Sequence, residues 1–303
     1  MNIKNTLVKN IKEIIYFIFG NLIIFNLFRF ITLKKTSNKI FVINYHNTYG
    51  AFKKNFIWQI NFFSKYFKII DYETIIKIQK KNKKIISKKP LLLITFDDGH
   101  RSNFEIATKV LNPRKIKAIF FIAPKFINYR WPNNLIKQCM ISKKKFNIPC
   151  NYNFEKKDNR RRIAMSWKDI KNLNNSGHTI GSHGMSHIRL SNKLNQKKIN
   201  YEISTSKKFL QKKFKTKIET FCWIGGERWA YSFNAYKAIK KANYKYSFMT
   251  CAKIFDPIRD DKYKVHRFNI ESFFSKNRVR ATMSLFYSLY YFPKRKFIDK
   301  LIT

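Results

Sequence analysis

The chain has 303 residues, and its 63 lysines and arginines against 17 aspartates and glutamates give a formal net charge of +46. An apolar content of 45% and an aromatic content of 17% exclude a disordered, collagen-like or disulfide-scaffold protein. The four cysteines form no Cys-x-x-Cys pair, so the sequence predicts no structural zinc site. The length suits one large domain or two small ones.

The positive charge does not by itself indicate a nucleic-acid partner. The chain has only 8 glycines and 7 prolines, while Lys, Asn, Ile, Phe and Tyr are abundant, a bias that A/T-rich codons produce. The sequence contains no RNP, zinc-finger or helix-turn-helix signature. We therefore expect the lysines to cover solvated surface, and we expect no nucleic acid among the partners.

The predicted elements begin with an apolar segment over residues 12–30. Its uncharged run, residues 14–28, is shorter than the roughly 20 apolar residues that a spanning helix needs. A signal anchor, an interfacial helix and a packed helix are the alternatives, and the basic flanks favour peripheral membrane association. We divide the chain into an N-terminal part, residues 1–38, which contains this segment, and one domain over residues 39–303. We favour a location in the cytoplasm or at the cytoplasmic face of the inner membrane, with a periplasmic location through an uncleaved anchor as the alternative.

Short apolar strands and helices alternate along the rest of the chain. Strands are predicted over residues 39–45, 91–96, 118–123, 178–182, 219–224, 244–249 and 263–268. Helices are predicted over residues 55–68, 103–111, 166–177, 199–214 and 231–242. Residues 128–165 are polar and basic, so we expect an irregular insertion that forms a lid or a flap near the substrate. The alternation implies a parallel sheet, and about seven such units favour a single α/β domain with a distorted (β/α)7-type barrel.

Polar residues and glycines lie at or close to the carboxyl ends of these strands, where a barrel carries its active site. They are His46, Asp97, Asp98, His183, His187, Gly225, Gly226 and His266. Asp98 with the pair His183 and His187 forms a two-histidine, one-carboxylate set that leaves coordination positions open for water and substrate. Four-residue spacing places both imidazoles on one side of a helical turn, and Asp97 then acts as general base. The structural alternative for the aspartate pair is an Asx turn that caps a helix.

The segments TFDDG at residues 95–99 and SHGMSH at residues 182–187 resemble the first two motifs of the polysaccharide deacetylases, the NodB-homology carbohydrate esterases. The resemblance runs from about residue 39 to about residue 272. It implies a distorted barrel that removes acetyl groups from N-acetylated oligo- or polysaccharides with a divalent metal. Zn²⁺ is the first choice for that metal, with Co²⁺, Mn²⁺, Ni²⁺ and Fe²⁺ as alternatives.

The resemblance also implies roles for individual residues. Asp97 matches the catalytic base, and Asp98, His183 and His187 match the metal ligands. A backbone N–H near Gly225 would stabilise the oxyanion together with the metal, and Trp223 would stack on a sugar ring.

Two departures from the family pattern concern the third and the last motif. The third motif, FCWIGG at residues 221–226, lacks the arginine that would orient the base, so Arg228 or Arg267 would have to serve. The late motif that supplies the general acid is absent in its plain form. His266 is the nearest candidate and His46 is the second, for proton transfer or substrate contact. We expect His100 and His178 to be structural.

The leading hypothesis is therefore a metal-dependent hydrolase that deacetylates a sugar of a bacterial-type surface polysaccharide or of its precursor. One alternative is a catalytically weakened barrel that binds glycan or a membrane surface, because the third motif is altered and the charge is high. A second alternative is a non-haem iron oxygenase, which uses the same ligand types. The order of the ligands and the additional carboxylate of Asp97 argue against the oxygenase.

Overall fold

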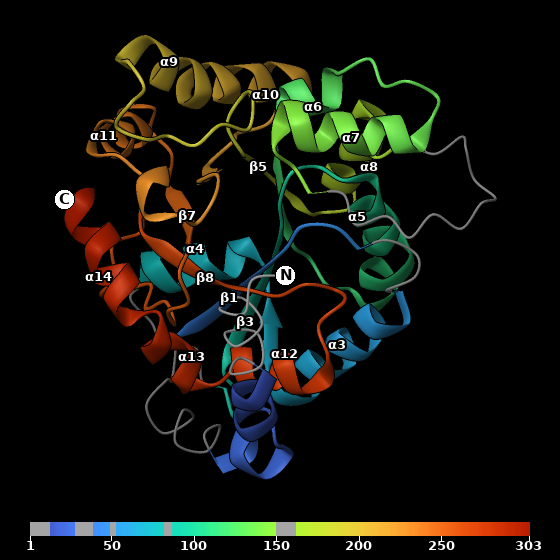
Figure 1. The fold of residues 1–303 in the computed structure, drawn as a ribbon, viewed down its shortest axis with the longest axis vertical. Helices are drawn as coiled ribbons and strands as arrows, with labels where there is room; N and C mark the ends of the chain where they lie inside the picture. Colours follow the sequence, from blue (N-terminus) through green and yellow to red (C-terminus); the bar gives the residue numbers. More distant parts are fainter. Residues whose placement is uncertain (1–12, 28–38, 49–52, 82–86, 150–161) are drawn as a thin grey trace, which may run out of the picture.

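A computed structural model describes residues 13–27, 39–48, 53–81, 87–149 and 162–303 of the chain. Seven parallel strands close into a barrel (Figure 1). In ring order they are β1 (Ile40–Tyr45), β8 (Val265–Asn269), β7 (Tyr246–Thr250), β6 (Thr220–Cys222), β5 (Thr179–Ser182), β4 (Ile119–Ile122) and β3 (Leu91–Phe96). The ring closes because β1 pairs with both β8 and β3. This confirms the predicted barrel of the (β/α)7 type.

An eighth strand, β2 (Lys68–Ile70), lies outside the ring and was not predicted. It pairs with the first half of β3, at residues 91–93, while β4 pairs with the last two residues of the same strand. The two neighbours share one edge of β3, so the barrel is distorted at this point. A three-residue strand with the sequence KII is too short to give an alternating pattern.

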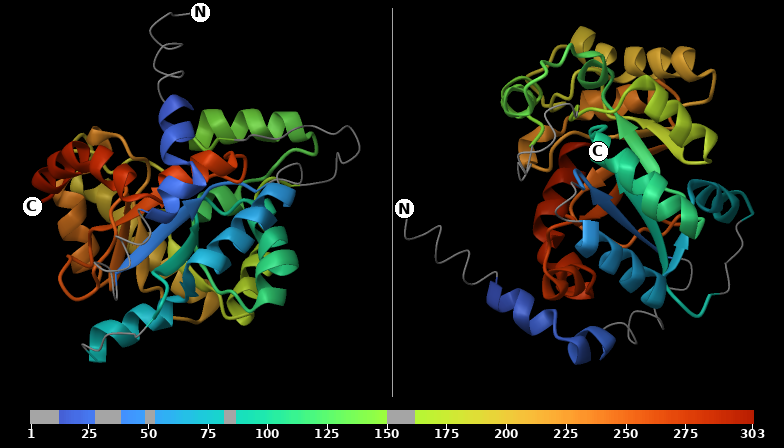
Figure 2. Two further views of the ribbon diagram at one scale, coloured as in Figure 1. Left: turned by 90° about the horizontal axis from the view of Figure 1, so that it is seen from below. Right: turned by 90° about the vertical axis from the view of Figure 1, so that its right-hand side faces the viewer.

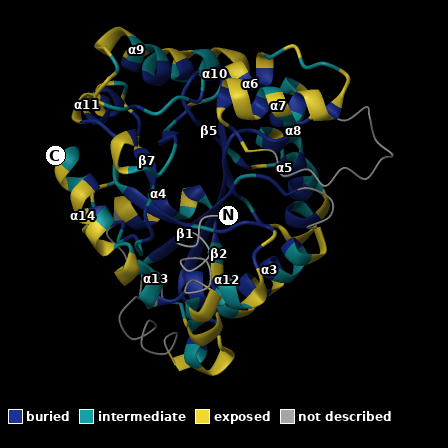
Figure 3. Cartoon of the chain, viewed as in Figure 1, coloured by how far each residue is buried: buried dark blue, intermediate teal, exposed yellow. Residues whose placement is uncertain are grey.

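Helices cover the outside of the barrel (Figures 1 and 3). They include α3 (Lys53–Tyr66), α5 (Arg101–Ile106), α8 (Trp167–Asn175), α9 (Gln196–Asn200), α10 (Ser206–Phe214) and α11 (Phe233–Lys241). The apolar side of α4 (Tyr72–Lys81) packs against the inner cluster of the barrel. A capping box formed by Ser166 and Asp169 starts α8, as the sequence predicts.

The insertion is not irregular as expected. It contains the end of α6 (Pro124–Asn128) and the twelve residues of α7 (Leu135–Phe146). The side chain of Asn134 caps the start of α7, and Asn147 ends the helix in the left-handed conformation. The residues between 150 and 161 lie outside the described part of the chain.

The N-terminal apolar segment forms two short helices, at residues 13–19 and 22–27, instead of one long helix. The chain turns at Gly20, where a Cβ atom would collide with the backbone carbonyl of Asn277. The first helix lies against α12 (Lys276–Thr282) and α13 (Leu285–Tyr290), and the second packs through Phe25 on α3 (Figure 2). The last helix is α14 (Phe292–Leu301). Among the described residues, no helix has the length and hydropathy that crossing a membrane requires.

Candidate active site

The carboxyl ends of four strands bring the polar residues of the site together. Asp97 and Asp98 follow β3, His46 follows β1 and His183 follows β5, while Arg267 lies within β8. Because all strands of the barrel run parallel, these ends meet at one rim. Apart from His46, these residues are almost completely buried.

Three predicted metal ligands converge on one point. The Oδ1 atom of Asp98 lies 3.4 Å from Nε2 of His183 and 3.1 Å from Nε2 of His187. All three ligand atoms lie within 4.8 Å of one another. Burial acts to raise the pKa of the Asp98 carboxyl, but the neighbouring histidines hold it well below its usual range.

The hydrogen bonds of this cluster fit a bound cation. Nδ1 of His183 donates to the carbonyl of Cys222 at 3.0 Å, and Nδ1 of His187 donates to the carbonyl of Phe146 at 2.6 Å. With Nδ1 bonded to a backbone carbonyl, each imidazole has Nε2 on the side of Asp98, where it could bind a cation. Neither carboxylate oxygen of Asp98 has a hydrogen-bond partner among the described residues. Two imidazole nitrogens and one carboxylate oxygen that converge on one point are a donor set that suits a divalent metal.

Two of these ligands have left-handed backbone conformations. Asp98 has a φ of 72° and His187 a φ of 58°, next to Gly99 at 93°. The prediction that His183 and His187 share a helical turn is wrong, because residues 183–187 form an irregular loop with Gly184 at a φ of 71°. The imidazoles converge because this loop curls, and not because of a helical repeat.

Glu202 holds that loop in place, although the sequence analysis did not single it out. This fully buried carboxylate accepts hydrogen bonds from the backbone N–H of Met185 at 2.9 Å and of Ser186 at 2.8 Å, and from the Ser186 hydroxyl at 2.6 Å. The chain has few acidic residues, so each glutamate could have been considered as a candidate for a special role. However, a glutamate within an amphipathic helix usually faces solvent.

Asp97 is paired with Arg267 across the barrel. The guanidinium donates to both carboxylate oxygens of Asp97 at 2.7 Å and to the hydroxyl of Thr95 at 3.0 Å. Burial acts to raise the pKa of Asp97, but Arg267 outweighs it and holds the pKa below its usual value. Asp97 is therefore a carboxylate at neutral pH. Of the two arginines considered from the sequence, Arg267 takes this position, while Arg228 lies over the ring of Phe297.

His46 lies on the open side of Asp97. Its Nε2 is 4.0 Å from Oδ2 of Asp97, and its Nδ1 is 2.6 Å from Oε1 of Glu271. About a third of the side chain, 32%, is exposed, so it can meet a substrate. Burial lowers the pKa of His46, but Glu271 raises it more, to about 10. Glu271 was not among the residues predicted for the site.

His266 does not reach this site, so we withdraw it as the general acid. Its Nε2 lies 3.3 Å from Oδ1 of Asp299 on α14, outside the barrel. Alternate residues of a strand point to opposite faces, so Arg267 points inward and His266 outward. Burial also lowers the pKa of His266.

The structure likewise corrects the expectation for Trp223. Its side chain is 1% exposed and donates from Nε1 to the Ser247 hydroxyl at 2.9 Å, so it cannot stack on a sugar. The exposed tryptophan of this loop is Trp229, whose ring lies 5.9 Å from the Arg189 guanidinium. Gly225 sits in the same loop with a φ of 80°, and its oxyanion role stays a prediction.

The remaining two histidines differ in their relation to the site. Nε2 of His100 is 3.5 Å from Oδ2 of Asp98, whereas His183 and His187 lie closest to Oδ1. His178 lies elsewhere, bonded to the backbone N–H of Ala118 and to Asn112, and burial lowers its pKa to about 4. His178 is therefore structural, as expected, while His100 also contacts a ligand of the site.

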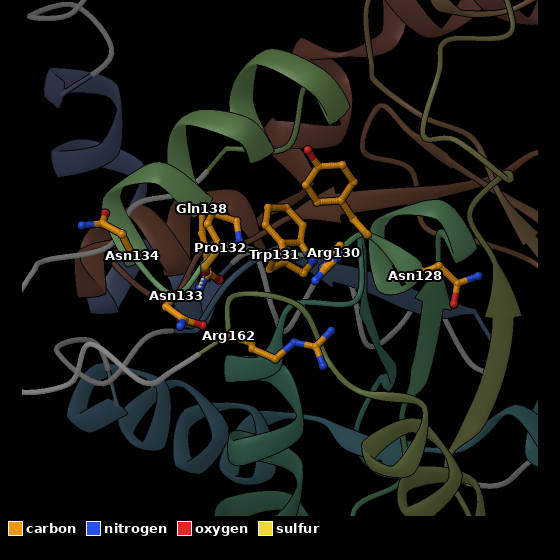
Figure 4. Close-up of a pocket in the computed structure, with 9 residues that line it drawn as sticks. Asn128, Arg130, Trp131, Pro132, Asn133, Asn134, Gln138 and Arg162 are labelled. Carbon is orange, nitrogen blue, oxygen red and sulfur yellow. Dashed lines mark hydrogen bonds between the residues drawn. The ribbon is translucent and has the colours of Figure 1, made fainter.

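A cavity of about 910 Å³ lies in the insertion, beside the start of α7 (Figure 4). Its lining consists of Asn128, Tyr129, Arg130, Trp131, Pro132, Asn133, Asn134, Gln138 and Arg162. None of the predicted site residues lines it, so it is separate from the cluster of Asp98, His183 and His187. The insertion meets that cluster at the other end of α7, where the Phe146 carbonyl accepts from His187.

The geometry agrees with what comparison to known proteins shows. A model of the polysaccharide deacetylase family matches residues 84–247, more than half of the chain. The chain belongs to the polysaccharide deacetylase family. Family membership supports sugar deacetylation and a hydrolase activity, and it confirms the resemblance seen in the TFDDG and SHGMSH segments. The search of curated proteins gave no match.

Solved polysaccharide deacetylases share the fold. The Streptococcus pyogenes deacetylase PplD, determined in complex with acetate, is 16% identical with a TM-score of 0.61 over 82% of this chain and 100% of that one. A de-N-acetylase from Aggregatibacter actinomycetemcomitans is 16% identical with a TM-score of 0.59 over 81% and 100% of the two chains. IcaB from Ammonifex degensii is 16% identical with a TM-score of 0.57 over 82% and 97%.

Proposed function

We propose that this polysaccharide deacetylase hydrolyses the N-acetyl group of a sugar in a bacterial-type surface polysaccharide or its precursor, with a divalent metal. The observation that carries the proposal is the convergence of Asp98, His183 and His187 beside the Asp97–Arg267 pair. A cation bound by these three ligands would polarise the acetamide carbonyl and make water more acidic. Zn²⁺ fits a set of two imidazoles and one carboxylate best. For location, we propose the cytoplasm or the cytoplasmic face of the inner membrane.

The residues beside the ligands supply the proton transfers. The carboxylate of Asp97 accepts a proton from the attacking water, whose oxygen bonds to the carbonyl carbon. Arg267 holds both oxygens of Asp97 and so orients the base. As the C–N bond breaks, the protonated His46 gives its proton to the departing sugar amine. The products are acetate and a free amine.

His46 is suited to this second transfer by position and charge. Its imidazole is exposed on the side of Asp97 that is open to substrate, and Glu271 fixes the ring by accepting from Nδ1. With a pKa of about 10, it is protonated at neutral pH. The weakened-barrel alternative loses one of its two grounds, the altered third motif, because Arg267 supplies the arginine that this motif lacks.

The test is acetate release from oligomers of N-acetylated hexosamines by the full chain. We expect release that stops when a chelator removes metal and resumes when Zn²⁺ is added back. Release that a chelator leaves unchanged would overturn the metal dependence. Binding of the oligomer with stoichiometric Zn²⁺ but without acetate release would favour a glycan-binding role instead.

Replacing Glu271 with glutamine should shift the pH dependence of kcat/KM. In the native protein Glu271 keeps His46 protonated up to about pH 10. Without this carboxylate, only the smaller effects of Asp98 and Asp97 oppose burial, so the pKa of His46 should fall and the alkaline limb of the profile should move to lower pH. The measurement is a pH series of kcat/KM, with Glu219→Gln, at the amino end of β6, as the matched control. An alkaline limb unchanged in Glu271→Gln would exclude His46 as the proton donor.

A further inference from the structure

Exposed apolar side chains gather on one part of the molecule, outside the catalytic cluster. Of the sixteen large hydrophobic side chains that are exposed among the described residues, ten lie in two segments. They are Ile14, Phe17, Ile18, Leu22, Ile23 and Leu27 in the N-terminal helices, and Leu289, Tyr290, Phe292 and Phe297 in α13 and α14. We call this set the terminal apolar face. Exposed groups of this kind mark interaction surfaces.

The two N-terminal helices are docked on the domain by their other sides. Phe25 is 2% exposed and packs against Phe62 and Tyr66 of α3. The ring of Phe19 stacks on Phe286 of α13 at 3.9 Å, so the two segments of the terminal apolar face are neighbours (Figures 1 and 2). This packing against the domain determines which side of each N-terminal helix points to solvent. A surface helix normally presents polar residues to water, whereas these two helices present apolar ones.

Positive charge flanks the C-terminal part of the terminal apolar face, and the described N-terminal helices carry a single charged residue, the exposed Glu13. Lys276 on α12 and Lys296 and Lys300 on α14 are exposed, and Asp299 is the one acidic residue between residues 276 and 300. Apolar side chains flanked by lysines match the interface of a bilayer, where the rings and aliphatic groups enter the acyl boundary and the ammonium groups meet anionic headgroups. A protein partner would need an acidic surface of matching shape, whereas a lipid surface adapts to the helices.

The terminal apolar face is connected to the catalytic rim. Glu271, which binds His46, is followed by Phe274, and the Arg278 guanidinium lies 3.5 Å from the centre of the Phe274 ring. The same guanidinium lies 5.1 Å from the ring of Tyr16 in the first N-terminal helix. This series of contacts places the helices on the side of the barrel where His46 opens to solvent.

We propose that the terminal apolar face docks the enzyme on a bilayer that contains anionic phospholipid, without crossing it. The docked orientation brings the rim with His46 towards the lipid headgroups. Resting on the proposed function, this favours a sugar acetamide held close to the membrane, as in a lipid-linked precursor, as the substrate.

The test is flotation of the full chain with two kinds of vesicle, phosphatidylcholine alone and phosphatidylcholine mixed with phosphatidylglycerol. The test variant is the double substitution Phe17→Ser with Ile23→Ser, whose side chains are 70% and 78% exposed. The matched control is Ile136→Ser with Met140→Ser on α7, at 55% and 51% exposure. We expect tight binding to the mixed vesicles, reduced by salt. The test variant should reduce the partition coefficient at least about tenfold, and the control should leave it unchanged.

Three outcomes would overturn the docking proposal. They are the absence of native binding to mixed vesicles, equal binding by the test variant, and a native dimer in light scattering that the test variant converts to monomer. The third would show that a second copy of the chain covers the face. Acetate release from a soluble oligomer separates this proposal from the proposed function, because the test variant should keep that activity in every case.

Discussion

Asp98→Asn should abolish high-affinity Zn²⁺ binding and lower kcat/KM for deacetylation at least about a thousandfold. The substitution removes the charge that faces both histidines while keeping the shape of the side chain. Asparagine tolerates the φ of 72° at this position, whereas alanine would add backbone strain. The measurements are Zn²⁺ affinity by chelator competition and the rise in Tm on adding Zn²⁺. That rise should occur in the native protein and be absent in the variant.

Asp71→Asn is the control for this experiment. Asp71 accepts from the backbone N–H of Thr74 at the start of α4, and an asparagine oxygen can do the same. We expect the control to bind Zn²⁺ and release acetate like the native protein. An Asp98→Asn protein that keeps native Zn²⁺ affinity would show that the cation is held elsewhere.

Arg267→Met should lower kcat/KM on the order of a hundred- to a thousandfold and move the acid limb of the pH profile upward. Without the guanidinium, burial is opposed only by the smaller effects of His183 and His46, so the pKa of the Asp97 carboxyl rises and the base is ionised only at higher pH. Breaking a buried ion pair also costs about 3–5 kcal/mol of stability. Arg267→Lys is the second variant. It keeps the positive charge but loses the two-point contact. It should therefore retain part of the activity, and its acid limb should lie at lower pH than that of Arg267→Met.

Arg295→Lys serves as the matched control for the arginine variants. Arg295 is also buried and donates to the carbonyl of Ala252 at 2.6 Å, but it lies on α14, outside the barrel. We expect it to change stability without moving the acid limb. A folded Arg267→Met protein with a native acid limb would rule out Arg267 as the residue that positions the base.

Most of the barrel was predictable because its strands are buried on both sides. Runs such as LLLITF and IFFI are almost uniformly apolar, which is typical of parallel strands under helices. The α7 helix was not predicted because its lysine-rich sequence has a weak apolar pattern. Likewise, the C-terminal helices have no strand after them to mark a repeating unit.

Some residues of the candidate site could be predicted from their immediate sequence neighbours, whereas others depend on contacts between distant parts of the chain. Asp97 and Asp98 are adjacent in sequence, and their position after an apolar strand was enough to place them at the rim. Arg267 and His266 are neighbours too, but the sequence does not say which of them faces inward. Glu271 approaches His46 over 225 positions of the chain. Only the closure of β8 on β1 brings these two together.

Asp98 and His187 have left-handed backbone conformations that are unfavourable for non-glycine residues. The residues that the proposed activity needs at these positions are therefore not the ones that would make the chain most stable. Each non-glycine residue in that conformation costs on the order of 1–3 kcal/mol unless its surroundings compensate. Without selection for activity, glycine should accumulate at both positions because it removes the torsional penalty, and at position 98 it also removes a buried carboxylate. The expected product is a sturdier barrel that no longer holds a cation, so a relative with glycine at either site is best interpreted as a former enzyme.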